Sequence, residues 1–518
     1  MLSYSFYFAA WFLSLSTASA YTINLISDIH YDPAYGTGNG YVCTSSTSPP
    51  LGKATCDSPK LLVDLFINDA KSQNSTFTIF GGDFQRHHFS SSGTTIAETF
   101  GGVAEALATT VEEHNVIATI GNNDVVPDYT FDWEHPGEDD GLLERVGELK
   151  KYGIVDADEA KEMNQCGYYV RHTEEVDFIV LHTLVWTYAL KPTVPDTEAD
   201  PCGQLEFLST SLASARTNGK KVFVLGHIPP VLNVYKVKTS GKFTSDSGDV
   251  YWRSRFLKRY VALMTEYNDC IVLQLYGHTH MYALLTDEAV GVPLMILPSV
   301  SPIFANQPSY LVADFDAKSN LKGLFQRYLD PNTSTIVEGM NILGAMGLPY
   351  GLGHPTILTN STRRLLTSDE FWQNYRLLQS GGVLTNHVYT TCDSFCRAVI
   401  VCSQLHFDYT QIKTCVETNS KTTPNTAVPV NARGSIITSI LILGSVFIVC
   451  VILVATHYYK QKREAQEEDA IQILSLAVDS EEVAKPHASA HRRERGYRPE
   501  KFGKPGKKTP GGLPGENG

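Results

Sequence analysis

Five short groups of Asp, Asn, His and Gly residues carry the side chains whose types and spacing could do chemistry, and each follows a run of β-branched, aliphatic or aromatic residues. Carboxylates, amide oxygens and imidazoles suit zinc, and also manganese, iron or cobalt. Two such ions about 3.5–4 Å apart can activate water and neutralise phosphoryl oxygens. The sequence therefore predicts two divalent metal ions, with zinc as the first expectation, in a hydrolase of phosphoric esters or anhydrides. The seven predicted metal ligands, with Asp83 shared by both ions, are Asp28, His30, Asp83, Asn122, His227, His278 and His280.

The strands that must position these groups alternate with amphipathic helices from Tyr21 onward. Such alternation predicts an α/β fold, with helices on the faces of a sheet. Because ligands bind beyond the carboxyl ends of the strands in open α/β sheets, we expect the five groups to meet at one rim. Strands are predicted at 22–27, 77–80, 116–120, 178–181, 221–225 and 271–276, and helices at 60–71, 95–114, 205–217 and 251–267.

The pattern changes after Tyr276, where β-rich runs follow one another closely with no long helix between them. These runs, at 282–285, 294–298, 310–315 and 324–329, predict a second, more antiparallel sheet. The later part of the chain has a helical run at 368–379 and then a cluster of four cysteines. It is predicted to form a small helical appendage held by disulfides.

The two ends of the chain predict a single-pass type I membrane protein of the secretory pathway. The N-terminal segment is apolar and ends in small residues, which is typical of a signal peptide. A second apolar segment is long enough to span a bilayer of about 30 Å, and the basic residues directly after it place the C-terminus in the cytosol. The predicted segments are a signal peptide at 1–20, the catalytic domain at 21–340, the appendage at 341–420, a stalk at 421–434, a transmembrane helix at 435–457 and a disordered cytosolic tail at 458–518.

The charge balance limits the partners of the protein. The chain has 42 Lys and Arg against 55 Asp and Glu, a net charge of -13. Binding to a nucleic-acid backbone needs many basic side chains at once, so nucleic acid is not expected as a structural partner. A phosphorylated small molecule or polyphosphate fits, because bound metal cations invert the local charge of a site. The membrane is contacted through the one predicted helix, and the sequence leaves the oligomeric state open.

Cysteines and glycosylation sequons indicate an oxidising compartment. Of the 10 cysteines, Cys450 lies in the predicted membrane helix and Cys270 at the start of a predicted buried strand, where a free thiol is expected. Asn74, Asn332 and Asn360 begin sequons that can be glycosylated in the secretory pathway. The eight cysteines expected to form disulfides are Cys43, Cys56, Cys166, Cys202, Cys392, Cys396, Cys402 and Cys415.

The five groups occur in one order along the chain: Asp28-Ile29-His30, Gly82-Asp83, Gly121-Asn122-Asn123-Asp124, Gly226-His227 and Gly277-His278-Thr279-His280. In this order they resemble the motif series of the calcineurin-like metallophosphoesterases. The resemblance covers residues 21–329 and implies a two-sheet sandwich flanked by helices. It also implies one metal on Asp28, His30, Asp83 and His280, and the other on Asp83, Asn122, His227 and His278.

Within that superfamily, three features are similar to the acid sphingomyelinase-like phosphodiesterases. These are the run Gly226-His227-Ile228-Pro229-Pro230, the stretch 297–308, and the spacing of Cys392, Cys396, Cys402 and Cys415. The resemblance implies that Cys392 pairs with Cys396 and that Cys402 pairs with Cys415. That group usually has His after the ligand Asn, where this chain has Asn123.

Asn123 resembles instead the related endopolyphosphatases, as does the sequence Asp83-Phe84-Gln85-Arg86-His87. With Asn123 at the catalytic position, this resemblance implies that His87 acts as the general acid. Arg86 could hold an anionic phosphate chain, since guanidinium groups match phosphate oxygens. The alternative is that both side chains belong to a solvated loop.

Three hypotheses on function follow. The first is an endopolyphosphatase-like hydrolase in the lumen of an acidic, lysosome- or vacuole-like organelle, which an acidic dileucine-type sequence at 469–474 favours, or at the cell surface. The second is an acid sphingomyelinase-like phosphodiesterase acting on nucleotides or phosphodiesters. The third, of another class, is a receptor or adhesion ectodomain without catalysis.

Overall fold

The computed structural model describes residues 20–89, 93–138, 140–348, 351–352, 355–383 and 392–420. The predicted signal peptide, apart from its last residue, and the predicted stalk, transmembrane helix and tail lie outside these residues. Within the described part, no helix is both long and apolar enough to cross a membrane.

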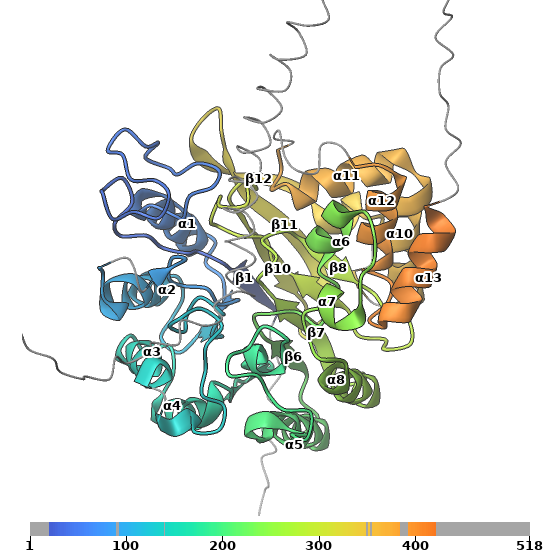
Figure 1. The fold of residues 1–518 in the computed structure, drawn as a ribbon, viewed down its shortest axis with the longest axis horizontal. Helices are drawn as coiled ribbons and strands as arrows, with labels where there is room; N and C mark the ends of the chain where they lie inside the picture. The colour runs from blue at the N-terminus through green and yellow to red at the C-terminus, as the bar shows by residue number, and fades with distance from the viewer. Residues whose placement is uncertain are drawn as a thin grey trace, which may run out of the picture. The chain divides into compact units, whose positions relative to one another are not determined.

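Two six-stranded sheets form the centre of the described chain (Figure 1). In the first, β1, β2 and β3 are parallel, while β10 pairs antiparallel with β1 and continues into β11 and β12. Its strands, in spatial order, are β12 Thr335–Asn341, β11 Leu321–Asp330, β10 Ser309–Phe315, β1 Tyr21–Ile26, β2 Phe77–Phe80 and β3 Val116–Ala118.

The second sheet has a parallel centre of β5, β6, β7 and β9, with β4 and β8 antiparallel at its two edges. In spatial order its strands are β4 Tyr169–His172, β5 Asp177–Val180, β6 Val222–Leu225, β7 Ile271–Tyr276, β9 Leu294–Ile296 and β8 Ala283–Leu285.

The strands after Tyr276 do not form a sheet of their own, so that prediction is wrong. β8 and β9 extend the second sheet and β10 to β12 extend the first. The reason is pairing between distant segments: β10 lies on the free edge of β1, where Leu25 faces Leu311, and β9 on the free edge of β7. The short apolar runs of both sheets look alike in the sequence, so they do not specify which edge each strand joins.

Aromatic side chains join the two sheets face to face. Phe77 of β2 packs edge-on against Phe178 of β5 at a ring-centroid distance of 5.2 Å. Phe223 of β6 packs edge-on against Phe315 of β10 at 5.3 Å. Such edge-to-face pairs add to the burial of each ring. The predicted two-sheet sandwich is therefore present, with its core between the sheets.

Helices flank the sandwich: α1 contacts the first sheet at β12, and α5 contacts the second at β5. The helix predicted at 95–114 is shorter than expected, because a π-helical turn at Ala97–Gly101 leads into an α-helix that ends at Leu107. Thr109 and Thr110 donate side-chain hydrogen bonds to the carbonyls of Ala106 and Leu107, which takes up the last acceptors of the helix. The helices before the appendage are α1 Lys60–Ser72, α2 Gly102–Leu107, α3 Asp140–Lys151, α4 Ala157–Cys166, α5 Gln204–Thr217, α6 Val234–Ser240, α7 Asp246–Asp249 and α8 Ser254–Glu266.

The appendage is helical, as expected, and packs on the edge of the second sheet. The amide of Thr286, just after β8, donates to the carbonyl of Gln404 at 2.7 Å. Tyr375, Leu378 and Ile400 belong to the same hydrophobic core as the sandwich. Its helices are α9 Ile342–Ala345, α10 Pro355–Thr367, α11 Asp369–Gln379, α12 Ser394–Cys402 and α13 Tyr409–Asn419.

The described residues form four disulfides, and Cys270 is a buried free thiol. Two of them have the pairing that the resemblance implies, Cys392 with Cys396 and Cys402 with Cys415. The other two are Cys43–Cys56 and Cys166–Cys202. Asn74, Asn332 and Asn360 are all exposed, and their glycosylation stays a prediction.

Candidate metal centre

The loops that follow β1, β2, β3, β6 and β7 bring the seven predicted metal ligands together at one edge of the sandwich. Five of the seven adopt the left-handed backbone conformation, which costs a non-glycine residue about 1–2 kcal/mol. Strain of this kind concentrates at functional sites, where the backbone must turn sharply to aim a side chain. The five are Asp28 (φ 50), His30 (φ 46), Asp83 (φ 59), His278 (φ 71) and His280 (φ 61).

One group of donors consists of Asp28, His30 and His280. The Nε2 atoms of the two imidazoles are 3.1 Å apart, and the Nε2 of His280 is 3.3 Å from Oδ1 of Asp28. The Nδ1 of His30 lies 3.2 Å from the carbonyl of Gln85, so it donates there and leaves the lone pair on Nε2. A metal-binding histidine typically donates its second ring nitrogen in this way.

The second group consists of Asp83, His227 and His278. The Nε2 of His227 is 3.1 Å from Oδ2 of Asp83 and 3.1 Å from Oδ1 of Asn122. Its Nδ1 lies 2.6 Å from the carbonyl of Gly81, so Nε2 again faces the other donors. Oδ2 of Asp83 is also 3.4 Å from Nε2 of His30, which puts this carboxylate within reach of both groups.

Burial and charge at the site suit a cation. Asp28 and Asp83 are 0% and 1% exposed, and buried carboxylates are costly unless a cation compensates them. Burial would raise the pKa of Asp83, but His227 beside it lowers the pKa well below its usual value. Burial also lowers the pKa of His30 and of His278 to about 3, so both imidazoles are neutral. The residues present therefore fit two divalent ions that share Asp83.

The two residues after Asn122 orient this set. Asn123 donates to Asp83 twice, from its backbone N–H at 2.9 Å and from Nδ2 at 2.8 Å. Asp124 accepts from four backbone N–H groups: Gly121 at 2.8 Å, Asp83 at 2.9 Å, Phe84 at 2.8 Å and Gln85 at 3.2 Å. Asn123 thus positions Asp83, while Asp124 ties the loop after β2 to the loop after β3.

Glycine is required at position 121 because the loops after β2 and β3 approach each other closely there. A Cβ atom at this position would lie 2.1 Å from Oδ1 of Asp83 and 2.4 Å from its backbone nitrogen. Both atoms are fixed by hydrogen bonds, so neither can move away. Only glycine therefore lets Asp83 take its place between the two donor groups.

His87 lies beside the first donor group and is held by a carboxylate. Its ring stacks on that of His30 at a centroid distance of 4.2 Å. Oδ1 of Asp57 is 2.9 Å from Nδ1 of His87, and Oδ2 accepts from the His87 backbone N–H at 2.8 Å. Burial lowers the pKa of His87, but Asp57 more than offsets this and raises the pKa above its ordinary value.

Arg86 is not brought to the cavity. Its side chain is 2% exposed, and its guanidinium donates to Oδ1 of Asp32 at 3.2 Å, to the carbonyl of Asn39 at 2.7 Å and to the carbonyl of His87 at 3.0 Å. These bonds hold the loop that carries His87. Among the predicted site residues, Arg86 thus supports the loop and is not one of the residues that line the cavity.

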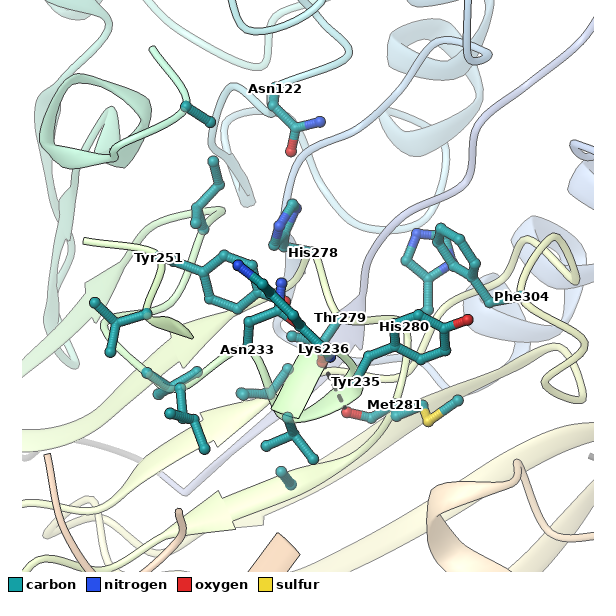
Figure 2. Close-up of a pocket in the computed structure, with 18 of the residues that line it drawn as sticks. Asn122, Asn233, Tyr235, Lys236, Tyr251, His278, Thr279, His280, Met281 and Phe304 are labelled. Atoms are coloured by element: carbon teal, nitrogen blue, oxygen red, sulfur yellow. Dashed lines mark hydrogen bonds between the residues drawn. The ribbon is translucent and has the colours of Figure 1, made fainter. Parts of the chain in front are cut away.

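A cavity of about 240 Å³ opens over the candidate ligands. Asp83, Asn122, His278 and His280 line it together with His87. Figure 2 shows the ring of Tyr251 beside His278 and that of Phe304 beside His280, and both pairs are edge-to-face, with centroids 4.9 Å and 4.5 Å apart.

The sequence reasoning missed Asp57, Tyr251 and Phe304. Asp57 lies thirty residues before its partner His87, and no local pattern connects the two positions. A possible signal was its place directly after Cys56, which forms a disulfide with Cys43 and so fixes that segment. Phe304 lies inside the stretch at 297–308, but nothing in that stretch alone assigns this ring to the site.

The chain belongs to the calcineurin-like phosphoesterase family, whose model matches residues 21–282. The family fold implies divalent metal ions, in agreement with the two donor groups. The chain is therefore a hydrolase that acts on phosphoric esters.

Its relatives include an acid sphingomyelinase-like phosphodiesterase and other phosphodiesterases. It is 24% identical over 366 residues to sphingomyelinase phosphodiesterase D of Dictyostelium discoideum, over 67% of this chain and 79% of that protein. It is 25% identical over 431 residues to acid sphingomyelinase-like phosphodiesterase 3b of Mus musculus, over 76% and 89%. A cyclic GMP-AMP phosphodiesterase of Homo sapiens is 24% identical over 430 residues, over 76% and 89%.

Proposed function

We propose that this protein is a two-metal phosphodiesterase that cleaves phosphodiesters of small organic molecules. The observation that carries the proposal is a single cavity that joins the two donor groups and His87 to a largely apolar wall. The names of the three relatives support a diester substrate. The cavity and the names of the relatives together favour the second hypothesis, a phosphodiesterase. The first hypothesis, an endopolyphosphatase, rested on the motif around Asn123.

The geometry supports the two ligand sets that the family resemblance implies. Asp28, His30, Asp83 and His280 would hold one ion, and Asp83, Asn122, His227 and His278 the other. When bound, two such ions activate water and neutralise phosphoryl oxygens. The protein's own part is to keep Asp83 between the two groups, through its bonds from Asn123.

His87 is the proposed general acid. Its bond with Asp57 fixes the imidazole in place and raises its pKa, so that the ring carries a proton at mildly acidic pH. The leaving alkoxide takes that proton as the ester bond to phosphorus breaks, and a general acid of this kind contributes roughly 10²–10⁴-fold to the rate.

The cavity wall is poorly suited to polyphosphate. A polyanion needs several cationic side chains along its path. Of the described residues that line the cavity, Lys236 is the one Lys or Arg, and its Nζ donates to the carbonyl of Gly248. The nearest candidate in the sequence, Arg86, is bound to Asp32 instead.

We also propose that the enzyme works in an oxidising compartment, outside the cell or in the lumen of the secretory pathway or a lysosome. The four disulfides support this, because such bonds persist in oxidising surroundings. One of them, Cys43–Cys56, adjoins Asp57 and thereby the proposed general acid.

The test is a substrate profile of the full-length chain loaded with zinc, manganese or cobalt. Bis(p-nitrophenyl) phosphate should be hydrolysed and long-chain polyphosphate should remain intact. An Asp83→Ala variant should lose both metal and activity, since both ions share that ligand. Shortening of polyphosphate with no diester cleavage would overturn the proposal, and a chain that neither binds metal nor turns over would favour the receptor hypothesis.

A further inference from the structure

The cavity extends from the candidate ligands to the C-terminal appendage. Beyond His278 and His280 its walls come from three separate parts of the chain: α6 and the residues around it, strands β8 and β9, and the helices α11 and α12. Figure 2 shows α6 residues at the near side of the cavity and Met281 below His280. Apolar residues of these three walls include Leu232, Val234, Ala283, Leu285, Tyr375 and Ile400.

These walls are held together by a second hydrophobic cluster, which is separate from the main core. In it, Val237 of α6 packs with Val399 and Cys402 of α12 and with Ile412 of α13. The hydroxyl of Tyr409 donates to Oδ2 of Asp249 at 2.9 Å and links α13 to α7. The Cys402–Cys415 disulfide joins α12 to α13 in the same place. The appendage therefore fixes the position of α6 over the cavity.

The volume of the cavity indicates the size of the group that it can hold. A dry cavity of about 150 Å³ lined by Leu, Ile and Phe accommodates benzene. At about 240 Å³, this cavity has room for one ring-sized group beside a phosphoryl group.

The chemistry of the walls also favours a ring-sized group. Tyr251 and Phe304 stand edge-on to the candidate ligands His278 and His280. Tyr375 also lines the cavity, and its hydroxyl is 3.4 Å from the carbonyl of Tyr282. Aromatic side chains favour edge-to-face and offset contacts with another ring. Gln379 adds one polar group, whose Oε1 is buried and has no hydrogen-bond partner among the described residues.

We propose that the space between α6, β8 and the appendage is a subsite for a compact aromatic group carried on the phosphorus of the substrate. The appendage then takes part in substrate selection. This inference rests on the proposed function, because the group must be linked to a phosphoryl group seated at the metal ligands. It goes beyond that function by naming the substituent and the part of the chain that recognises it.

Direct binding of phosphonates tests the subsite without requiring turnover. In isothermal titration calorimetry on the full-length, metal-loaded chain, phenylphosphonate should bind roughly 10- to 100-fold more tightly than methylphosphonate, the gain expected from burying a ring. Val234→Trp, which fills the cavity from α6, should abolish this difference, and Ala283→Leu, which fills it from β8, should reduce it. Thr239→Trp is the matched control, because Thr239 is exposed on the same helix and does not line the cavity.

Equal affinities for the two phosphonates, or a difference that Val234→Trp and Ala283→Leu leave intact, would overturn the proposal. Tighter binding of dodecylphosphonate than of phenylphosphonate would also overturn the proposal if Val234→Trp abolished that preference. Such a result would indicate a lipid subsite. Failure of the proposed function has another signature. In that case diesters are not hydrolysed, whatever the ratio of the two phosphonate affinities.

Discussion

At the scale of single residues, the centre depends on side chains that hold other side chains. Asp57 holds His87, and Asn123 holds Asp83. The role of such a supporting residue is measured through the property that it changes in its partner side chain. For Asp57 that property is the pKa of His87.

Replacing Asp57 with Asn should move the basic limb of the pH–rate profile to lower pH. The carboxylate raises the pKa of His87, so its loss lowers that pKa, and the proton needed for the leaving group is lost earlier as the pH rises. The measurement is kcat/KM against pH with a dialkyl phosphodiester, whose leaving alkoxide needs that proton. Asp64→Asn, which removes an exposed carboxylate paired with Lys60, is the control. An unshifted limb would show that His87 is not the acid.

The seven metal-ligand candidates could be predicted from the sequence because each lies directly after a recognisable strand. Their residue types are those that metals prefer, and strand ends of an α/β fold converge. Arg86 could not be placed in the same way. Its partners Asp32 and Asn39 are about fifty residues distant, and an exposed loop and a buried support have the same sequence pattern.

At the scale of elements, the site depends on the connection between the loops after β2 and β3. Asp124 forms that connection with its two carboxylate oxygens, each of which accepts from two backbone N–H groups. Ten of the twelve strands in the described residues were predicted to within a few residues, but β4 and β12 were not predicted. The distribution of the strands between two sheets was not predicted either, because edge pairing such as that of β1 with β10 joins segments far apart in the sequence.

Asp124→Asn should lower the stability of the chain by about 3 kcal/mol, because an amide NH₂ would face two backbone N–H donors in place of an acceptor. The readout is the midpoint of urea unfolding, together with bound metal per chain, which should also fall. Asp330→Asn, in an exposed turn, provides the control and should change stability by less than about 0.5 kcal/mol. A variant of Asp124 with normal metal content would show that the two loops keep their places without this carboxylate.

At the scale of the whole molecule, the buried carboxylates couple metal binding to folding. Asp28 and Asp83 are inaccessible to solvent, and a ligand that binds only the folded chain stabilises it. Metal occupancy should therefore be visible in the stability of the entire sandwich.

Treatment with a chelator should lower the Tm of the full-length chain by roughly 5 °C or more. Differential scanning calorimetry before and after chelation, and after zinc is restored, measures the effect. Asp83→Ala should respond to neither treatment, because it lacks the shared ligand. A chelator-insensitive Tm in the unsubstituted chain, at confirmed metal loss, would mean that the fold does not depend on the ions.

The left-handed backbone at Asp28, His30, Asp83, His278 and His280 has a consequence for how this site can change. At each of these positions glycine would relieve the conformational cost. The backbone cost is therefore concentrated on residues that the metal centre needs, and a glycine that relieved it would also remove a ligand and the hydrogen bonds of that side chain. A screen for thermal stability alone would not detect such a loss, so metal content has to be measured beside it.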